Sequence, residues 1–232
     1  MRVTLERGEI HAWHVSTENH LSSLNACRAI LSAAEIERAE RFRFDTDRER
    51  FVIAHGILRE ILSAYTATPA VSLRFVTGAH GKPALDGGSE IRFNLSHAGN
   101  QVLYAVTLDR EVGIDVERIR PDRDHAAIAQ RFFSPEERHC LETLTGEAQA
   151  QLFFRLWTRK EAYLKALGTG ISEGLGSFSA AFTGGPPFEL RGHTLWDLEA
   201  PPGYAAAVAV EGLTQTTVRY QPAGLLQKSP QS

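Results

Sequence analysis

The stretch WTRKEAYLKALG, residues 157–168, ends a long helical pattern that begins near Glu147. At 3.6 residues per turn, its apolar side chains form one broad stripe, which is typical of a helix packed against a protein core. Lys160 lies in the middle of that stripe. Because a buried ammonium group is costly unless a carboxylate or phosphate receives it, the pattern predicts a partner for Lys160 elsewhere in the chain. Gly168 then predicts the end of the helix.

Glu161 and Lys165 lie one turn apart at the edge of the same stripe, close to Trp157. One interpretation is an ordinary surface ion pair at i and i+4, which stabilises a helix by about 0.2–0.5 kcal/mol. The unusual position of Lys160 and the large aromatic side chain beside Glu161 favour another interpretation. In that second interpretation, this edge of the helix belongs to a functional site.

The composition is that of a globular protein able to bury a core, because 43% of the 232 residues are hydrophobic and 23% are charged. The length allows one large domain or two of about 110 residues. A net charge of −3 argues against a nucleic-acid-binding protein. Cys27 and Cys140 match no metal or redox spacing, which indicates free thiols. With no apolar run near the ~20 residues of a membrane span and no signal-peptide pattern, we expect a cytoplasmic protein without a membrane partner.

The remaining pattern predicts further helices and strands. Ser32 with Glu35, and the quartet Ser134-Pro135-Glu136-Glu137, have the spacing of helix starts. Apolar periodicity predicts helices over residues 47–65 and 126–133. Residues 222–232 are expected to be a disordered tail. Strands are predicted over residues 10–15, 73–77, 91–95, 102–107, 112–117, 177–182, 194–198, 204–210 and 216–220.

Two segments of the chain are similar to each other. GNQVLYAV begins at Gly99 and GYAAAVAV begins at Gly203, an offset of 104 residues. A long helix precedes a strand-turn-strand section in each half. An offset close to half the chain length is typical of a duplicated subdomain. The pattern therefore predicts an N-terminal subdomain of residues 1–109 and a C-terminal subdomain of residues 110–221.

The segment GIDVE, residues 113–117, combines acidic and apolar residues on one strand. Alternation places Asp115 and Glu117 on the same face. Two neighbouring carboxylates repel each other, and solvent, basic partners or a divalent cation can relieve the repulsion. An exposed edge strand paired with nearby arginines is one interpretation. Glu161 and Lys165 favour another, in which three carboxylates and a lysine bind a Mg²⁺-pyrophosphate group.

Polar residues upstream could contact such a ligand. Lys82 lies in a glycine-containing turn that suits phosphate contact, although such a turn is not specific. A strand runs directly into Ser96 and His97. A nucleophilic Ser-His pair is conceivable, but adjacent strand residues point to opposite faces, so two ligand-anchoring groups are the better interpretation. Arg38 and Arg50 belong to a basic cluster that is also compatible with a solvated face paired with glutamates.

These motifs together resemble a known family. GIDVE, RFFSPEE at residues 131–137 and WTRKEAYLKALGTGIS at residues 157–172 are similar to the signature of the 4′-phosphopantetheinyl transferases, of the two-subdomain, surfactin-synthetase-activating type. FNLSHAG and HGKPAL resemble upstream motifs of the family, so the resemblance covers residues 32–182. It implies an α/β (α+β) fold of two similar subdomains related by pseudo-twofold symmetry. Each subdomain would be a small, mostly antiparallel sheet packed on a long helix, with the site in the cleft between them.

The resemblance also implies roles for individual residues. By motif, the Mg²⁺ ligands fall on Asp115, Glu117 and Glu161, and the phosphate-binding lysine falls on Lys165. Asp115, Glu161 and Lys165 would form the catalytic group, with Glu161 or a metal-bound water as the base. Residues that contact coenzyme A fall on Lys82, Ser96 and His97, and also on Arg50 and Arg38. Glu35 departs from the family, because several relatives have a basic residue there, near the coenzyme A 3′-phosphate.

The implied reaction is transfer of the phosphopantetheine arm of coenzyme A to a serine of an acidic apo carrier protein, with release of 3′,5′-ADP. The enzyme would act as a monomer, and the carrier would dock on Arg118, Arg120, Arg123 and Arg131, beside Phe132 and Phe133. Both phenylalanines could instead belong to the core. Another Mg²⁺-dependent phosphoryl-transfer or pyrophosphate-cleaving enzyme is disfavoured, because no Gly-x₄-Gly-Lys-Ser/Thr loop occurs. A non-catalytic binding module, whose charged clusters are surface pairs, remains a further alternative.

Overall fold

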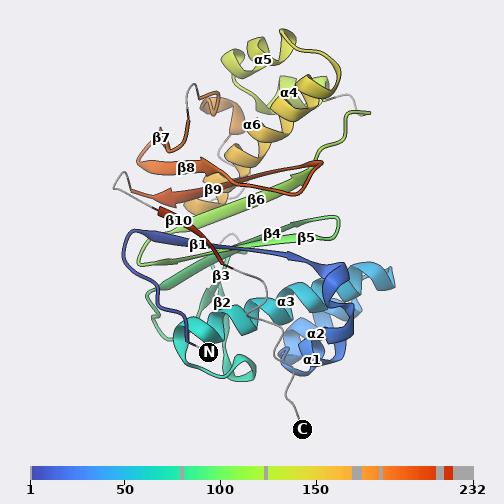
Figure 1. Ribbon diagram of the computed structural model, residues 1–232, viewed down its shortest axis with the longest axis vertical. Helices are drawn as coiled ribbons and strands as arrows, with labels where there is room; N and C mark the ends of the chain where they lie inside the picture. The colour runs from blue at the N-terminus through green and yellow to red at the C-terminus, as the bar shows by residue number, and fades with distance from the viewer. Residues whose placement is uncertain are drawn as a thin grey trace.

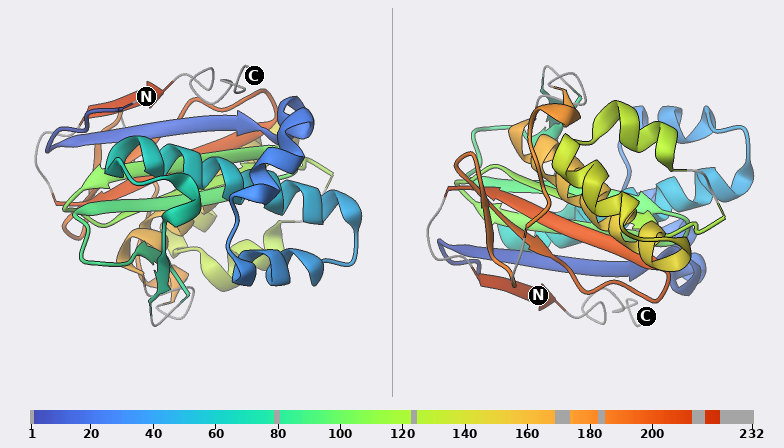
Figure 2. Two further views of the ribbon diagram at one scale, coloured as in Figure 1. Left: turned by 90° about the horizontal axis from the view of Figure 1, so that it is seen from below. Right: turned by 90° about the horizontal axis from the view of Figure 1, so that it is seen from above.

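The computed structural model describes residues 2–78, 81–122, 125–168, 174–182, 185–212 and 217–221. Two sheets lie in the middle of the molecule, with one long helix on each outer side (Figure 1). Seen from opposite directions, α3 covers one sheet and α6 covers the other (Figure 2). The predicted tail at residues 222–232 lies outside the described residues.

The first sheet has the strand order β10-β1-β5-β4. β1 (Glu9–Ser16), β5 (Gln101–Leu108) and β4 (Ile91–Ala98) pair antiparallel, whereas β10 (Thr217–Gln221) pairs parallel with β1. The helix α3 (Asp45–Thr66) packs on its outer face, where Ile53, Ile57 and Ile61 join Trp13 and Tyr104 in one core. The helices α1 (Leu24–Ala29) and α2 (Ala33–Glu40) lie beside α3 and contact it, preceded by the 3₁₀ turn Thr17–Ser23. A small ribbon of β2 (Phe75–Thr77) and β3 (Pro83–Leu85) follows another 3₁₀ turn, Ala70–Ser72.

The second sheet is antiparallel throughout and has the order β6-β9-β8-β7. Its strands are β6 (Val112–Arg118), β9 (Tyr204–Glu211), β8 (His193–Asp197) and β7 (Phe188–Leu190). The helix α6 (Gly146–Leu167) packs on its outer face and ends at Gly168 with φ of 69°, as its sequence predicts. The helices α4 (Ala126–Phe132) and α5 (Pro135–Glu142) lie beyond the N-terminal part of α6.

A shared apolar layer joins the two sheets. Ile10, Leu103 and Ala105 from the first sheet form one cluster with Ile114 and Val208 from the second. The two similar segments form β5 and β9, which both occupy interior positions of their sheets. The structure therefore confirms a two-subdomain α/β fold. β10 adds one detail: it follows the second half in the chain but pairs with the sheet of the first.

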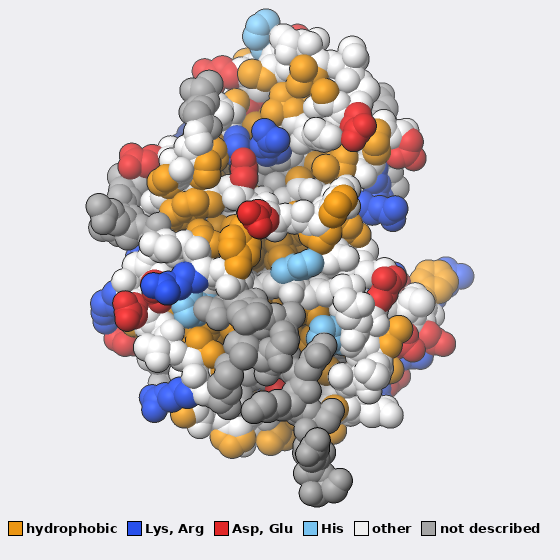
Figure 3. Space-filling view, viewed as in Figure 1, with side chains coloured by type: hydrophobic (Ala, Val, Ile, Leu, Met, Phe, Trp, Pro, Cys, Tyr) orange, Lys and Arg blue, Asp and Glu red, His pale blue; other side chains and the backbone are white. Residues whose placement is uncertain are grey.

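Charged side chains of both signs surround hydrophobic ones on the face shown in Figure 3. Hydrophobic side chains gather at the level of the two sheets on that face. Within the described ranges, no helix is long and apolar enough to cross a membrane.

Lys160 has the buried partner that its position predicts. Its Nζ lies 2.8 Å from an Oε atom of Glu137, and both side chains are fully buried. The ammonium also donates to the carbonyl oxygens of Leu175 and Phe178, at 2.7 and 2.6 Å. Glu137 in turn forms the capping box of α5 with Ser134, and Ser32 and Glu35 form the other predicted capping box. The conspicuous lysine of the helix is therefore part of the core and not a ligand-binding group.

The predicted strand at residues 177–182 is wrong. The 3₁₀ turn Leu175–Ser177 is followed by an irregular segment. Its backbone groups bind buried side chains instead of a neighbouring strand: the Ala180 carbonyl accepts from Arg159 at 2.9 Å, and the Ala180 amide donates to Glu137 at 2.7 Å. Since buried charges need such partners, they take the backbone groups that a strand ladder would use.

Candidate active site

The site is built where β4 and β6, edge strands of the two sheets, lie side by side. The Ile114 amide donates to Oδ1 of Asn94 at 2.9 Å, so a side chain bridges the strands at this point. Ser96 follows Asn94 by two residues and faces Asp115 across the seam, with Ser96 Oγ donating to Asp115 Oδ1 at 2.8 Å. Residues 19 positions apart in sequence thus meet between the two halves.

Gly113 explains why β6 can approach α6 so closely. A Cβ atom at this position would lie 2.1 Å from the carbonyl oxygen of Ala162 and 2.4 Å from the amide of Ala166. Both atoms belong to the helix backbone and cannot move aside. Because strand side chains alternate, Asp115 and Glu117 share the face of Gly113 and are brought against α6, which carries Glu161 and Lys165.

Lys165 binds Asp115. Its Nζ lies 2.6 Å from Asp115 Oδ1 and also donates to Ser96 Oγ at 3.0 Å and to the Ile114 carbonyl at 3.2 Å. The interpretation of Glu161 and Lys165 as an ordinary surface pair is therefore wrong. The ammonium is directed into the seam and holds the serine and the aspartate in one hydrogen-bonded group.

Two carboxylate oxygens in this group are buried and accept no hydrogen bond: Asp115 Oδ2 and Glu161 Oε1. Burial raises the pKa of Asp115, although Lys165 and Ser96 act in the opposite direction. Burial, and then the charge of Asp115, raise the pKa of Glu117 to about 7 and also raise the pKa of Glu161. The three acids therefore lie within electrostatic reach of one another, and Lys165 opposes the effect of burial on each of them.

The spacing of the acidic side chains determines whether they can hold a metal ion directly. Among the described residues, no group of three or more His, Cys, Asp or Glu side chains is arranged closely enough to hold an ion. Lys165 instead occupies Oδ1 of Asp115. The assignment of Asp115, Glu117 and Glu161 as metal ligands stays a prediction.

His97 lies on the other face of β4 from Ser96, as strand alternation predicts, and its side chain is exposed. Partial desolvation, followed by the positive charges of Lys165, His55, Arg38 and Arg50, lowers the pKa of His97. The cations from α2 and α3 are therefore near this end of β4. The predicted residues Arg38, Arg50 and His97 therefore share one region, and Lys165, whose charge acts on His97 more strongly than theirs, lies beside it.

Lys82 lies elsewhere. Its Nζ is 2.6 Å from Oε2 of Glu111, and Arg92 binds the other oxygen of Glu111 at 3.0 Å. Lys82 and Glu111 line a cavity of about 290 Å³, together with Leu167 and Gly168 at the end of α6. Arg38 lines a different cavity. The ion pair joins the β2–β3 turn to the start of the second half.

Sequence reasoning missed two residues of the Arg38 region, His55 and Arg59. They lie on one face of α3 with Phe51, at spacings of four residues, among the apolar residues that α3 buries. The principle applied to Lys160 also applies here: a charged side chain in an apolar stripe requires a partner. For Arg59 that partner is Glu35, at 2.6 Å.

Comparison with known proteins places the chain in a family. A model described as the 4′-phosphopantetheinyl transferase superfamily matches residues 111–209, and one described as 4′-phosphopantetheinyl transferase, N-terminal, matches residues 11–109. The chain is 41% identical over 216 residues to the 4′-phosphopantetheinyl transferase HetI of Nostoc sp., covering 90% of this chain and 91% of the relative. It is 39% identical to psf-1 of Bacillus pumilus, covering 79% and 76%, and 31% identical to Sfp of Bacillus subtilis, covering 78% and 82%. The chain belongs to the 4′-phosphopantetheinyl transferase superfamily, as a member with two subdomains.

Proposed function

We propose that this enzyme transfers the 4′-phosphopantetheine arm of coenzyme A to a serine hydroxyl of an apo carrier protein, releasing 3′,5′-ADP. The observation that carries the proposal is the hydrogen-bonded Ser96-Asp115-Lys165 group at the seam, with Glu117 and Glu161 within electrostatic reach of Asp115. The names of HetI, psf-1 and Sfp support the same activity. No observation favours another pyrophosphate-cleaving reaction.

Asp115, Glu117 and Glu161 supply the kind of oxygen donor that Mg²⁺ prefers, although the described side chains are not arranged as a closed ion site. Asp115 Oδ2 and Glu161 Oε1 are buried oxygens without hydrogen-bond partners, and Mg²⁺ is bound in proteins by carboxylates together with substrate phosphates. Burial is the main cause that raises the pKa of each of the three acids, and the neighbouring acids raise the pKa of Glu117 and Glu161 further. We propose that Asp115, Glu117 and Glu161 hold the ion. When bound, Mg²⁺ would neutralise charge that develops on the pyrophosphate.

The side chains of the chain itself would bind and orient the reactants. Lys165 is a cation held in place by Asp115 and Ser96, so it can receive a phosphate oxygen without reorganising. Burial raises the pKa of Glu161, which makes its carboxylate a better proton acceptor near neutral pH. We propose Glu161 as the group that takes the proton from the serine hydroxyl of the carrier.

Arg38, Arg50 and His97 are proposed to bind phosphate groups of coenzyme A. Replacing each by Ala should then raise the KM for coenzyme A. A residue on the 3′-phosphate will show a much larger effect with coenzyme A than with dephospho-coenzyme A. Equal effects on both substrates would assign the residue to the pyrophosphate, and the same comparison for Lys82 tests whether it leaves Glu111 to bind substrate.

The carrier is proposed to be acidic and to dock beside β6. Arg118 and Arg120 are exposed at the end of this strand, and the charge of Arg120 is close enough to lower the pKa of Glu117 against the effect of burial. Phe133 is 3% exposed and belongs to the core, whereas Phe132 is half-buried under Arg131. Arg123 lies outside the described residues.

We further propose a cytoplasmic monomer with its subdomain boundary between residues 109 and 110. The two family models, which end at 109 and begin at 111, support this boundary. The fused pair of subdomains supports a monomer, because both halves of the seam come from one chain.

The experiment that tests the activity is incubation with coenzyme A, Mg²⁺ and an apo carrier protein, followed by mass spectrometry of the carrier. We expect the carrier to gain the mass of one phosphopantetheine and 3′,5′-ADP to appear in equal amount. Asp115→Asn is the negative control. Cleavage of coenzyme A without a change in the mass of the carrier would replace the proposal by a hydrolase, and binding without turnover would replace it by a binding module.

A further inference from the structure

The β2–β3 ribbon adjoins two cavities. One, of about 750 Å³, is lined by the ribbon together with α2 and α3. The other, of about 290 Å³, is lined by the ribbon together with β4 and the C-terminal end of α6. Thr77 and Pro83 line both cavities, so the position of the ribbon affects the shape of each. The contacts that hold the ribbon therefore matter for a ligand in either cavity.

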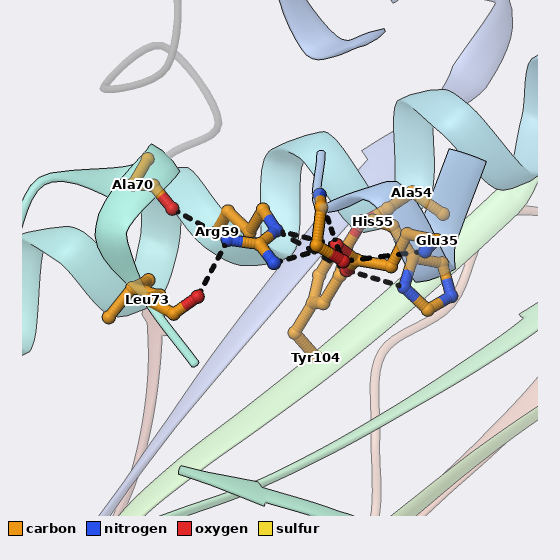
Figure 4. A network of polar contacts seen from close by, with 8 residues as sticks. Glu35, Ala54, His55, Arg59, Ala70, Leu73 and Tyr104 are labelled. Carbon is orange, nitrogen blue, oxygen red and sulfur yellow. Dashed lines mark hydrogen bonds and ion pairs between the residues drawn. The ribbon is translucent and has the colours of Figure 1, made fainter. Parts of the chain in front are cut away.

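The start of the ribbon is fixed from α3. Arg59 donates to the carbonyl oxygens of Ala70 and Leu73, just before β2, at 2.8 and 3.0 Å. Arg59 is itself held by Glu35 (Figure 4). Its guanidinium also lies 5.0 Å from the centre of the Phe75 ring, at the first position of β2. This end of the ribbon is therefore anchored to the core of the first subdomain.

The turn end of the ribbon is more exposed. Each strand has only three residues, and a two-stranded hairpin by itself is marginally stable in water. Val76 and Thr77 are exposed. Within the turn, the Gly78 amide donates to the Lys82 carbonyl at 2.9 Å. Contacts from outside the ribbon are therefore needed to fix this end.

Such a contact comes from the second subdomain. Glu111 Oε2 lies 2.6 Å from Lys82 Nζ, and Glu111 Oε1 lies 3.0 Å from Nε of Arg92 on β4. Lys82 Nζ also lies 3.5 Å from the carbonyl oxygen of Ala166, in the last turn of α6, where unsatisfied carbonyl groups favour a cation. Because Glu111 directly precedes β6, one carboxylate joins the ribbon, β4 and β6.

Lys82 can keep this partner and still bind a ligand. An ammonium group has three N–H donors. Glu111 and the Ala166 carbonyl accept from two of them, and within the part of the chain that the structure describes the ammonium forms no third hydrogen bond. Lys82, Arg92 and Glu111 together carry two positive charges and one negative charge. The group as a whole therefore attracts an anion while Lys82 stays bound to Glu111.

We propose that Glu111 is a positioning residue for coenzyme A, because it holds the Lys82 ammonium and the turn of the ribbon where they receive the ligand. This inference rests on the proposed function, since it takes Lys82 as a contact of coenzyme A. The proposal has a sign that can be measured. As a nearby negative charge, Glu111 would oppose binding of an anionic ligand, whereas as the support of Lys82 it favours binding.

The test is calorimetric titration of coenzyme A, without carrier, into the wild type and Glu111→Gln. A partly exposed ion pair contributes up to a factor of about five to an equilibrium constant, so the Kd should rise by up to that factor. In the transfer assay the KM for coenzyme A should rise equally. Because Asp115 and Lys165 are unchanged, kcat and the KM for the carrier should stay within about twofold.

The matched control is Glu90→Gln. Glu90 is an exposed acid directly before β4, and it lies 3.6 Å from Arg7. The substitution removes the same charge from the same subdomain without touching Lys82. It should leave the Kd for coenzyme A unchanged or slightly lower.

A double-mutant cycle with Lys82→Met separates positioning from a general effect on the fold. When Lys82 is replaced, Glu111→Gln should change the Kd for coenzyme A by less than about twofold, because Glu111 no longer has the ribbon cation to hold. Glu111→Asp keeps the charge but shortens the reach, so it should also weaken binding. This variant keeps the inference testable if Glu111→Gln does not fold.

Two results would overturn the role of Glu111. One is unchanged or tighter binding of coenzyme A by Glu111→Gln, and the other is an equal loss with and without Lys82. If the wild type modifies a carrier while either result is found, only the positioning role fails. If the wild type neither binds coenzyme A nor modifies a carrier, the proposed function itself fails.

Discussion

The two carboxylate oxygens of Asp115 lie in different surroundings. Oδ1 accepts from Ser96 and Lys165, whereas Oδ2 is buried without a partner. Removing a carboxylate from water without full compensation raises its pKa, and Glu161 shares this property. At the scale of single residues, the seam contains buried carboxylate oxygens without hydrogen-bond partners, which a bound cation could stabilise in the ionised form. The cavity near Arg38 shows the opposite case, because there an acid is fully compensated by its own side-chain partners.

Glu161→Gln should reduce transfer by at least about a hundredfold, because the amide can neither accept the proton nor supply charge to a metal ion. The thermal unfolding midpoint should stay near that of the wild type. The measurement is kcat with saturating coenzyme A and carrier. Glu147→Gln, an exposed acid in the first turn of the same helix, is the matched control. Wild-type turnover by Glu161→Gln would contradict the proposed role.

Glu35 should make the protein sensitive to acid. Its pKa of about 2 in the folded state lies below the ordinary value of 4.5, so its stabilising effect is complete above pH 4.5 and is lost as the pH falls towards 2. The full effect is roughly 3 kcal/mol. Glu35→Gln should therefore be less stable at pH 7 and lose less stability between pH 4.5 and 2. Urea unfolding at several pH values measures this, with the exposed acid Glu37→Gln as the control; a parallel pH profile for Glu35→Gln would contradict the assignment.

At the scale of elements, the contact between β6 and α6 decides the geometry of the site. Gly113 allows the strand to approach the backbone of the helix, and Lys165 reaches back across the contact to Asp115. Lys160, which lies in the same C-terminal half of α6, binds Glu137 and the Phe178 carbonyl and so attaches α5 and the irregular segment after the helix. Gly113 thus sets the contact between β6 and α6, and the buried Lys160-Glu137 ion pair holds α6 against α5.

Gly113→Ala should destabilise the protein by at least about 3 kcal/mol, because the new methyl group meets helix backbone on two sides. It should also impair transfer in any fraction that remains folded, since Asp115 would move away from Lys165. Chemical unfolding and kcat are the measurements. Gly185→Ala is the control, because a Cβ there meets nothing within 4 Å. Wild-type stability for Gly113→Ala would mean that the strand can shift without cost.

At the scale of the whole molecule, the site depends on joining two subdomains. β4 comes from one half and β6 from the other, and Ser96 with Asp115 closes the seam between them. Lys82 and Glu111 form a second connection, and β10 returns from the second half to pair with β1. The carrier protein, in our proposal, approaches this joined surface from the end of β6.

Arg120→Glu should lower kcat/KM for an acidic carrier, and the loss should be greater at low salt than at high salt, because exposed charges act mainly on the rate of encounter. Coenzyme A affinity measured without carrier should barely change. Arg138→Glu, on α5, serves as the charge-matched control. If coenzyme A affinity falls as much as kcat/KM, Arg120 belongs to the nucleotide site and the carrier docks elsewhere.

The sequence was sufficient for the features that depend on near neighbours. Periodicity predicted the long helices, alternation predicted most strands, and the spacing of Ser32 with Glu35 and of Ser134 with Glu137 predicted two helix starts that the structure confirms. The apolar stripe around Lys160 predicted a buried partner. These features are local, because residues within a few positions determine them.

Tertiary structure alone decided the identity of each distant partner. Lys165 binds Asp115 across 50 positions, and Arg59 binds Glu35 across 24. The sequence motifs grouped Asp115 with Lys165 in one site, but no local pattern gave their direct ion pair or paired Arg59 with Glu35. Residues 177–182 have the alternation of a strand, yet their backbone groups bind Arg159, Lys160 and Glu137, because buried charges need more partners than side chains alone supply. Near neighbours set which residues become helix or strand, whereas packing and the desolvation of charged groups set which side chains meet.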